Sequence, residues 1–439
     1  MQKAKPGYKF VKSLFGKYEE IPEDWEQKLF QNIITKGPSS GLYSPIENYG
    51  KGNKIVGLGD VFKSDVLQTE GMRKVDLSED EKSRFILNSH DLVFSRYSLK
   101  FEGVGKCLFI PKINEIILFE SNTLRVSLSD FVNSRYIAYY FNSEAGRRNL
   151  IRILKQVSST GVTGTDLKNL KIILPPISEQ EKITSILSSS DELISSYDNI
   201  ITETKKLKNG LMQQLLTKGI GHKKFKKVKW LFGKEIEIPE EWDSFRLKQT
   251  CKKISVGIAT STTKHFVDNG VPLLRNQNIK NGYIDSKNLL YISEDFAKSN
   301  ESKRLREGDV ISMRTGYPGQ SAVVPSNMDG WQTFTTLIIR PNHKLLSSDY
   351  LVLYLNSFGR KQITSTQAGA AQQNLNAGWA SNLLIILPPL FEQQKIASIL
   401  SSVDDKITEL ESKKKSLESL KKGLMQKLLT GQIRVSVTN

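Results

Sequence analysis

The chain has 439 residues, of which 63 are lysine or arginine and 46 are aspartate or glutamate, so its net charge is +17. This length allows about two to three domains. The positive excess favours a polyanionic partner, most simply nucleic acid, although a basic surface that only aids solubility is an alternative. An anionic membrane surface is disfavoured, because no strongly apolar amphipathic face accompanies the charge.

The same composition argues against several other classes of protein. No apolar segment near the N-terminus has the length of a secretory signal, and no window of about 18 apolar residues predicts a membrane span. We therefore expect a cytoplasmic protein. Cys107 and Cys251 are too few and too far apart in the chain for a metal site, and the four histidines are scattered.

Residues 1–173 are predicted to form a first globular lobe, called lobe 1. Short apolar segments at 54–59, 91–95, 105–111 and 116–120 are separated by Gly, Pro, Asn and Ser, which is typical of strands joined by turns. A helical stretch at about 132–155 follows them. Strands and helices without regular alternation indicate a mixed α/β lobe.

Residues 174–217 are predicted to be one long helix. Pro175 and Pro176 disfavour helical backbone just before it, while Ser178 and Glu181 fit a capping box. A basic linker at 218–231 follows, which is equally suited to contacting phosphates and to lying free in solvent. Lobe 2 (residues 232–386) repeats the order of lobe 1, with 272–279 matching 54–61 and 309–314 matching 91–96.

A second long helix is predicted at 387–430, before a short tail at 431–439. Residues 387–430 match 174–217 at 23 of 44 positions without a gap. A second repeat lies ahead of each lobe, where 228–243 match 11–26 at 11 of 16 positions. A period near 215 residues is too long for a solenoid, so the chain contains two copies of one module.

Heptad spacing predicts that the two long helices form one antiparallel coiled coil. Apolar residues fill mainly one seam position in the first helix and the other position in the second. Antiparallel pairing brings these positions together, whereas parallel pairing sets apolar residues against lysines. We assign the seam to Ile186, Leu193, Ile200 and Leu207 in the first helix and Val403, Leu410, Leu417 and Leu424 in the second. Further apolar residues beside this seam widen the stripe and suit a partner protein.

Three loops of lobe 2 carry side chains suited to reading DNA bases, and lobe 1 has different residues at the same three places. Arginine recognises guanine, and asparagine or glutamine recognises adenine, through paired hydrogen bonds in the major groove. Any single residue fits a polar surface turn equally well, but the loops recur at matching places in both lobes. The candidate contacts are Arg96, Tyr97, Lys100, Lys106 and Thr163 in lobe 1 and Arg275, Asn276, Gln277, Asn278, Arg314, Thr315, Tyr317, Gln320, Gln372 and Gln373 in lobe 2. The lysines among them suit phosphates better than bases.

The sequence contains no recognisable catalytic motif. No phosphate-binding loop of an ATPase and no nucleophile elbow occurs. The Leu-Pro-Pro sequences at 174–176 and 387–389 lack the polar and aromatic residues that amino-methylating enzymes place around a flipped base. We expect a binding protein without cofactor of its own. A self-sufficient DNA methyltransferase and a coiled-coil scaffold without sequence specificity are the alternatives.

The chain resembles the specificity subunits of type I restriction–modification systems. The resemblance covers nearly the whole chain and is carried by the Leu-Pro-Pro-x-x-Glu-Gln starts at 174–180 and 387–393, the Gly-Leu-Met-Gln-x-Leu-Leu-Thr endings and the Ile-Pro-x-x-Trp lead-ins. It implies two target-recognition domains that read a bipartite double-stranded DNA sequence, with the helices as a spacer. It also implies that two modification subunits bind S-adenosylmethionine, and that restriction subunits, where present, use ATP and Mg²⁺.

Overall fold

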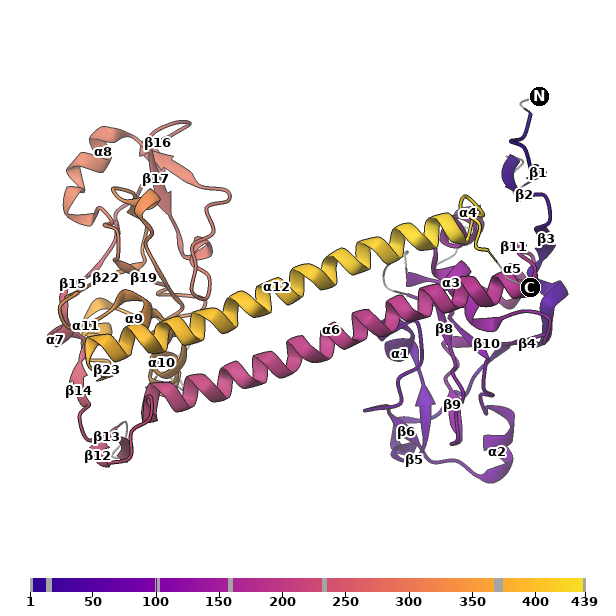
Figure 1. Cartoon of the computed structure of the whole chain (residues 1–439), viewed down its shortest axis with the longest axis horizontal. Helices are drawn as coiled ribbons and strands as arrows, with labels where there is room; N and C mark the ends of the chain where they lie inside the picture. Colours follow the sequence, from indigo (N-terminus) through magenta and orange to yellow (C-terminus); the bar gives the residue numbers. More distant parts are fainter. Residues whose placement is uncertain are drawn as a thin grey trace. The chain divides into compact units, whose positions relative to one another are not determined.

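The computed structural model describes residues 3–12, 18–98, 100, 103–156, 161–230, 235–366 and 374–436. The chain divides into two compact units, which are described separately (Figure 1). Unit 1 contains residues 1–198 and 412–439, and unit 2 contains residues 199–411. Two long helices run through both units, so each unit holds half of each helix. No helix in the described parts of the chain is long and apolar enough to cross a bilayer.

Unit 1 is built on a four-stranded antiparallel sheet in the order β4-β10-β7-β8. Its strands are β4 (Ile34–Ser40), β7 (Leu92–Ser95), β8 (Cys107–Phe109) and β10 (Thr123–Leu128). A three-stranded sheet, β6-β5-β9, lies beside it, with β5 and β9 parallel. Its strands are β5 (Tyr49–Val56), β6 (Lys74–Val75) and β9 (Ile117–Phe119). Two further pairs are β1 (Tyr8–Lys12) with β2 (Tyr18–Pro22), and β3 (Glu26–Leu29) with β11 (Lys171–Leu174).

Both faces of the sheet are buried at β7, which explains why this strand is apolar without alternation. Leu92 and Phe94 face one core with Tyr136 and Tyr140, whereas Val93 faces a second core. The short helices of unit 1 are α1 (Leu58–Lys63), α2 (Glu79–Arg84), α3 (Ser134–Asn142), α4 (Glu144–Gln156) and α5 (Gly164–Lys168).

The helix predicted at 132–155 is divided into α3 and α4 at Ser143. This residue has extended backbone, and its hydroxyl accepts the Gly146 amide at 3.2 Å, so Ser143 ends one helix and caps the next. The strand predictions for lobe 1 fall on β5, β7, β8 and β9, with ends that differ by a few residues.

Unit 2 repeats this arrangement. Its main sheet has the order β15-β22-β19-β20, the counterpart of β4-β10-β7-β8. These strands are β15 (Cys251–Val256), β19 (Val310–Ser312), β20 (Ser321–Val323) and β22 (Leu337–Pro341). The second sheet has the order β16-β18-β17-β21, with strands β16 (Phe266–Val267), β17 (Val271–Leu274), β18 (Leu290–Ile292) and β21 (Gln332–Thr333). The pairs are β12 (Phe225–Lys229) with β13 (Glu235–Pro239), and β14 (Asp243–Arg246) with β23 (Leu384–Leu387).

The short helices of unit 2 are α7 (Leu247–Thr250), α8 (Glu294–Ser299), α9 (Ser348–Tyr354), α10 (Arg360–Thr366) and α11 (Ala377–Ser381). From α8 onward they follow the order of unit 1, whereas α7 precedes β15 where unit 1 has a 3-10 turn at Phe30–Ile33. The segment 218–231, predicted as a linker, is partly structured, because β12 lies within it and pairs with β13. This hairpin is the counterpart of β1–β2, so the repeated unit begins before residue 232.

The long helices are α6 (Ile177–Lys218) and α12 (Leu390–Leu428). Both begin directly after Pro-Pro, and the carbonyl of Pro176 accepts the amides of Glu179 and Gln180. Ser178 therefore lies inside the first turn, and the predicted capping box is wrong. The second helix begins at the matching residue, Leu390, without a serine nearby. The proline pair sets the start of both helices.

Within each unit the two long helices run in opposite directions, which confirms the predicted antiparallel pairing. In unit 1, Lys414 contacts Asp198 at 2.6 Å and Lys421 contacts Asp191 at 2.5 Å. In unit 2 the corresponding ion pairs join Lys205 to Glu411 at 2.6 Å and Lys208 to Asp404 at 2.5 Å. As the number rises along α6, the number of its partner on α12 falls.

The predicted seam is half right. On α12, Leu410 is buried and Val403, Leu417 and Leu424 are half-buried, as expected for seam positions. On α6, Ile186 is half-buried and packs on the core, but Leu193, Ile200 and Leu207 are 46%, 46% and 57% exposed.

The correction on α6 has a simple physical reason. The seam continues four residues after Ile183, through Leu187 and Ile201, instead of three residues after it. Both spacings carry apolar residues, so the pattern fits either face. Three lysines also lie in the seam: Lys208, Lys414 and Lys421. Each forms an ion pair with a carboxylate of the other helix, and its aliphatic stem covers part of the seam.

Candidate nucleic-acid interface

The three predicted loops of lobe 2 lie together at one end of the main sheet. The first follows β17, the second follows β19, and the third precedes α11. The side-chain amide of Asn276 donates to the Thr315 hydroxyl at 3.1 Å and accepts the Arg314 amide at 3.3 Å. The Leu375 amide donates to the Arg314 carbonyl at 2.9 Å, and Arg314 Nε returns a bond to the Leu375 carbonyl at 3.2 Å.

Lobe 1 joins its second and third loops in the same way. The Val162 amide donates to the Arg96 carbonyl at 2.9 Å, as Leu375 does to Arg314. Tyr97 and Gly161 form an isolated bridge beside this bond. The side chain of Arg96 lies over the Tyr97 ring at 5.1 Å and donates to Ser40 Oγ at 3.3 Å. The matching loops are therefore held together by matching backbone bonds, while their side chains differ.

Six candidate residues are exposed at these loops: Tyr97, Lys100, Thr163, Gln277, Thr315 and Tyr317. Tyr97 is 42% exposed and Tyr317 is 60% exposed. Arg360, which the sequence analysis did not single out, lies over the Tyr317 ring at 5.6 Å. An aromatic ring beside an arginine combines base stacking with phosphate attraction, so these exposed groups suit a nucleic-acid surface.

Other candidates hold the loops in shape. Asn278 is 2% exposed, accepts the Arg275 amide at 3.0 Å and donates to the carbonyls of Asp285 and Lys287. Its side-chain amide is engaged in these three bonds, so Asn278 holds the turn in this structure, and base reading by Asn278 stays a prediction. Arg275 itself donates to the Asn288 carbonyl at 3.1 Å.

Three further candidates have structural partners of this kind. Gln320 donates to the Ile279 carbonyl at 2.9 Å, Thr163 caps α5 together with Asp166, and Lys106 lies 3.4 Å from Asp65. Gln372 and Gln373 lie outside the described residues. The sequence could not separate these roles, because the amide and hydroxyl groups that build a turn are the groups that read a base.

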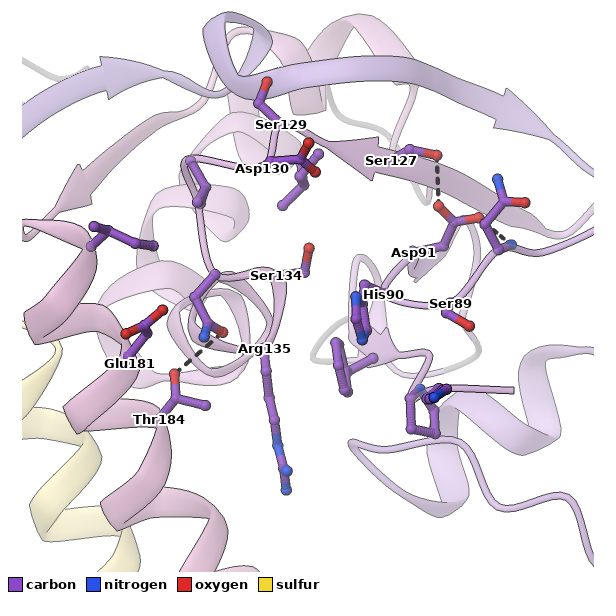
Figure 2. A pocket seen from close by; sticks show the side chains of 18 residues that line it. Ser89, His90, Asp91, Ser127, Ser129, Asp130, Ser134, Arg135, Glu181 and Thr184 are labelled. Carbon is purple, nitrogen blue, oxygen red and sulfur yellow. Dashed lines mark hydrogen bonds between the residues drawn. The ribbon is translucent and has the colours of Figure 1, made fainter. Parts of the chain in front are cut away.

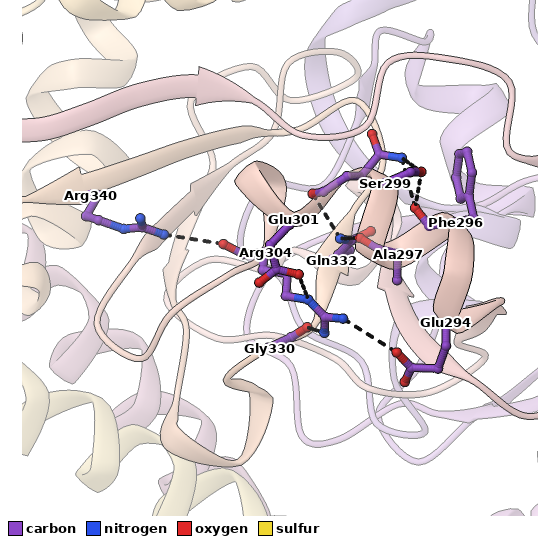
Figure 3. A network of polar contacts seen from close by, with 10 residues as sticks. Glu294, Phe296, Ala297, Ser299, Glu301, Arg304, Gly330, Gln332 and Arg340 are labelled. Carbon is purple, nitrogen blue, oxygen red and sulfur yellow. Dashed lines mark hydrogen bonds and ion pairs between the residues drawn. The ribbon is translucent and has the colours of Figure 1, made fainter.

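A network of polar contacts and ion pairs joins several segments within lobe 2 (Figure 3). Arg304 contacts Glu301 at 2.6 Å and Glu294 at 3.5 Å, and donates to the Gly330 carbonyl at 2.9 Å. Arg340 forms a two-bonded pair with buried Asp309, both bonds at 2.7 Å, and these bonds raise the pKa of Arg340. Both arginines are engaged inside the lobe, so they support the loops without contributing free charge to the surface.

The start of each long helix is anchored to the lobe that precedes it. The indole N–H of Trp25 donates to Glu179 at 2.9 Å, and that of Trp242 donates to Glu392 at 2.9 Å. Each following glutamine donates to the carbonyl of the first proline, and accepts an amide near the start of α3 or α9. These Trp and Glu-Gln residues are the ones that define the repeated motifs, so the motifs encode how helix and lobe are joined.

A basic residue completes each anchor from the end of the other long helix. Arg434 binds Glu179 with both bonds at 2.9 Å and also pairs with Asp24. In unit 2, His222 Nε2 lies 2.9 Å from Glu392. Gly431 and Gly219 turn the chain at these helix ends with φ of 71° and 66°, and a Cβ on either would collide with the proline or tryptophan of the lead-in motif.

A polar cleft lies beside the first turns of α6 in unit 1 (Figure 2). His90, Asp130, Arg135 and Glu181 line it, and Arg135 extends into the open space. A smaller cleft lies at the matching place in unit 2, lined by residues that include Pro325, His343, Asp349, Leu390 and Gln394. The cleft is therefore a duplicated feature, and no sequence motif indicates it. Among the described residues, no group of His, Cys, Asp and Glu forms a metal site.

Comparison with known proteins identifies the family. The model of the type I restriction modification DNA specificity domain matches residues 22–206 and 239–419. The type I restriction enzyme MjaVIII specificity subunit of Methanocaldococcus jannaschii is 31% identical over 95% of each chain. The putative MjaX specificity subunit of the same organism is 28% identical, also over 95% of each chain.

Solved structures agree in fold. A chain from a type I R-M system matches 94% of this chain and 99% of its own length, with a TM-score of 0.59 and 16% identity. The type I S subunit from M. genitalium matches 94% and 97%, with a TM-score of 0.53 and 12% identity. The repeated lobes, the paired long helices and the two matched domains lead to one conclusion: the chain belongs to the family of type I restriction–modification DNA specificity subunits.

Proposed function

We propose that each lobe of this specificity subunit reads one half of a bipartite double-stranded DNA target. The supporting observation is that the Arg96–Val162 and Arg314–Leu375 backbone bonds assemble equivalent loops in both lobes, yet the side chains on those loops differ. A shared frame with different exposed groups is what two readers of different half-sites require. The net charge of +17 suits contacts with DNA phosphates.

The residue count of α6 and α12 is proposed to select the spacing between the half-sites. Each helix carries the chain from one unit into the other, and ion pairs hold the two helices in register within each unit. Removing one heptad from both helices shortens each by about 10 Å, which corresponds to about three base pairs. The recognised spacer should shorten accordingly, while the half-sites stay the same.

Two modification subunits are proposed to dock on the long helices and beside their starts. Leu193, Ile200 and Leu207 leave an apolar stripe exposed along α6, and Leu420 is 59% exposed on α12. The clefts at the two helix starts occur twice at matching places, which suits two copies of one partner. The partners would bind S-adenosylmethionine, and ATP with Mg²⁺ where a restriction subunit is present.

Co-expression with a modification subunit, followed by sequencing of modified bases in host DNA, tests these proposals together. The expected result is methylation at one bipartite sequence, and a shortened spacer for the heptad-deleted variant. The chain alone, incubated with labelled S-adenosylmethionine, should transfer no methyl group. Methylation by the isolated chain, or an unchanged spacer after the deletion, would contradict the proposal.

A further inference from the structure

Two large apolar side chains protrude from lobe 1 just after β4. Tyr43 is 85% exposed and Ile46 is 91% exposed. We call residues 43–48 the tip. Its turn is ordered, because Asn48 donates from its amide to the Pro45 carbonyl at 3.2 Å and from its side chain to Ser44 Oγ at 3.1 Å. The turn therefore holds two large side chains, one aromatic and one aliphatic, exposed to solvent.

The base of the tip is fixed to the sheet. The Leu42 amide donates to the Phe119 carbonyl at 2.8 Å, and the Ser121 amide donates to the Leu42 carbonyl at 2.7 Å. A Cβ on Gly41 would lie 2.2 Å from the Phe119 carbonyl oxygen, so only glycine allows this approach. Leu42 is buried, and the side chains beyond it project from a rigid base.

The tip lies at the same edge of lobe 1 as two of the candidate reading loops. Ser40, three residues before Tyr43, accepts a hydrogen bond from Arg96 at 3.3 Å. In the third loop, a Cβ on Gly164 would lie 3.3 Å from Pro38 Cβ of β4. The strand that leads into the tip is therefore bonded to the loop that carries Arg96 and Tyr97.

Lobe 2 has the same base without the apolar tip. The Ile258 amide donates to the Thr333 carbonyl at 2.8 Å, and the Thr335 amide donates to the Ile258 carbonyl at 2.9 Å, as at Leu42. The residues that follow are Ala259, Thr260 and Ser261, which are small and exposed. The fold consequently does not require Tyr43 and Ile46, and their presence is specific to lobe 1.

We propose that Ile46, supported by Tyr43, reads thymine in the half-site of lobe 1 by contacting its 5-methyl group in the major groove. Thymine is the base that offers an apolar group there, and aliphatic or aromatic side chains are its usual partners. Arg96, at the same edge, supplies charge for the adjacent phosphates. This inference rests on the proposed function, because it needs a sequence-specific duplex.

The test uses the full chain and its target duplex, with each thymine replaced in turn by deoxyuridine, which lacks the methyl group. Binding of the unaltered chain should weaken about fourfold at one thymine or more of one half-site, the value of one buried methyl group. Ile46→Ala should bind the thymine and uracil duplexes equally, and Tyr43→Ala should reduce the difference.

The matched control is Ile116→Ala, which removes an apolar side chain of lobe 1 that is 42% exposed and lies on the turn before β9. This variant should keep the full thymine preference. Two results would overturn the thymine contact alone. In one, the unaltered chain binds every uracil duplex as tightly as the thymine duplex. In the other, Ile46→Ala weakens binding to the thymine and uracil duplexes by the same factor. Failure of the unaltered chain to prefer its target over a scrambled duplex would overturn the proposed function itself.

Discussion

Both units anchor the start of a long helix to the preceding lobe in the same way, but they use different residues as the second donor of the anchor. In both, a tryptophan of the lead-in motif donates to the glutamate at the start of a long helix. Unit 1 completes this anchor with Arg434, whereas unit 2 uses His222 and the amide of Ile220. The buried carboxylate needs donors on both oxygens, and the identity of the second donor is free to change.

In the reading loops, by contrast, the chemistry of the side chains changes between the two lobes. Their backbone bonds are alike, but the exposed groups beside them are Tyr97 and Lys100 in lobe 1 and Gln277, Thr315 and Tyr317 in lobe 2. Change is tolerated at the anchor because the chemistry is preserved, and change is required at the loops if the half-sites differ. Mutations at the two places should therefore affect different properties.

The largest expected effect is on stability, at the anchor tryptophans. Trp25→Ala should lower the free energy of unfolding of unit 1 by about 3–5 kcal/mol, because it removes a fully buried ring and one donor to Glu179. Trp242→Ala should do the same in unit 2. Hydrogen exchange resolved along the sequence measures the loss separately for each unit, with Trp→Phe as the milder control. An equal loss of protection in both units from one substitution would contradict two separate anchors.

The next effect is on specificity, at the loops. Arg314→Ala should relax discrimination at one base pair in the half-site of lobe 2, by about 1–3 kcal/mol if the guanidinium binds guanine with two hydrogen bonds. Binding to a panel of singly altered duplexes measures this effect. Because Arg314 Nε also holds the Leu375 carbonyl, Arg314→Lys serves as the control that keeps charge but loses the planar group. Uniform weakening on every duplex would indicate a phosphate contact.

Replacing the second donor of the anchor should have a smaller effect. Arg434→Gln removes two charged bonds to Glu179 and the pair with Asp24, but Trp25 still donates to the carboxylate. The arginine side chain is 40% exposed, so we expect a loss of about 1–2 kcal/mol in unit 1. Chemical unfolding of the variant measures it, with Arg434→Lys as the control. A loss as large as that of Trp25→Ala would mean that the arginine, rather than the indole, holds the anchor.

The sequence predicted the repeat, the long helices and their antiparallel pairing, because proline pairs and heptad spacing are local signals. It did not predict the seam of α6, since apolar residues follow Ile183 at spacings of both three and four. Lys208, Lys414 and Lys421 occupy seam positions only because acids of the other helix face them, which no local pattern reveals.

The candidate interface was predictable as a set of loops but not residue by residue. Asn278 has the composition of a reader and the contacts of a turn. Tyr43 and Ile46 were missed because an isolated apolar residue in a loop has no periodic neighbour to show which way it points. Their exposure depends on how the turn after Gly41 is held by the neighbouring strand.

The smallest effect concerns Asp91, which directly precedes β7 and matches Asp309, which directly precedes β19. Asp309 in lobe 2 faces Arg340, whereas Asp91 in lobe 1 accepts bonds from the Ser127 hydroxyl at 2.6 Å and the Asn88 amide at 2.8 Å (Figure 2). Burial raises the pKa of Asp91, because these two neutral donors do not offset the loss of water. A raised folded pKa means that the contribution of Asp91 to stability is present below the unfolded pKa of about 4 and is lost as pH rises through the folded value.

Asp91→Asn should remove this pH dependence, since the amide stays neutral and can still bond to Ser127 and Asn88. The free energy of unfolding of the variant, relative to the unaltered chain, should therefore rise as the pH increases above about 4, the unfolded pKa of an aspartate. Denaturant titrations at several pH values measure the difference. Asp309→Asn should instead destabilise lobe 2 throughout this range, because Arg340 loses its charged partner. A pH-independent difference for Asp91→Asn would show that the serine and amide bonds fully compensate for burial, and the two sheets would then differ only in how they satisfy one aspartate.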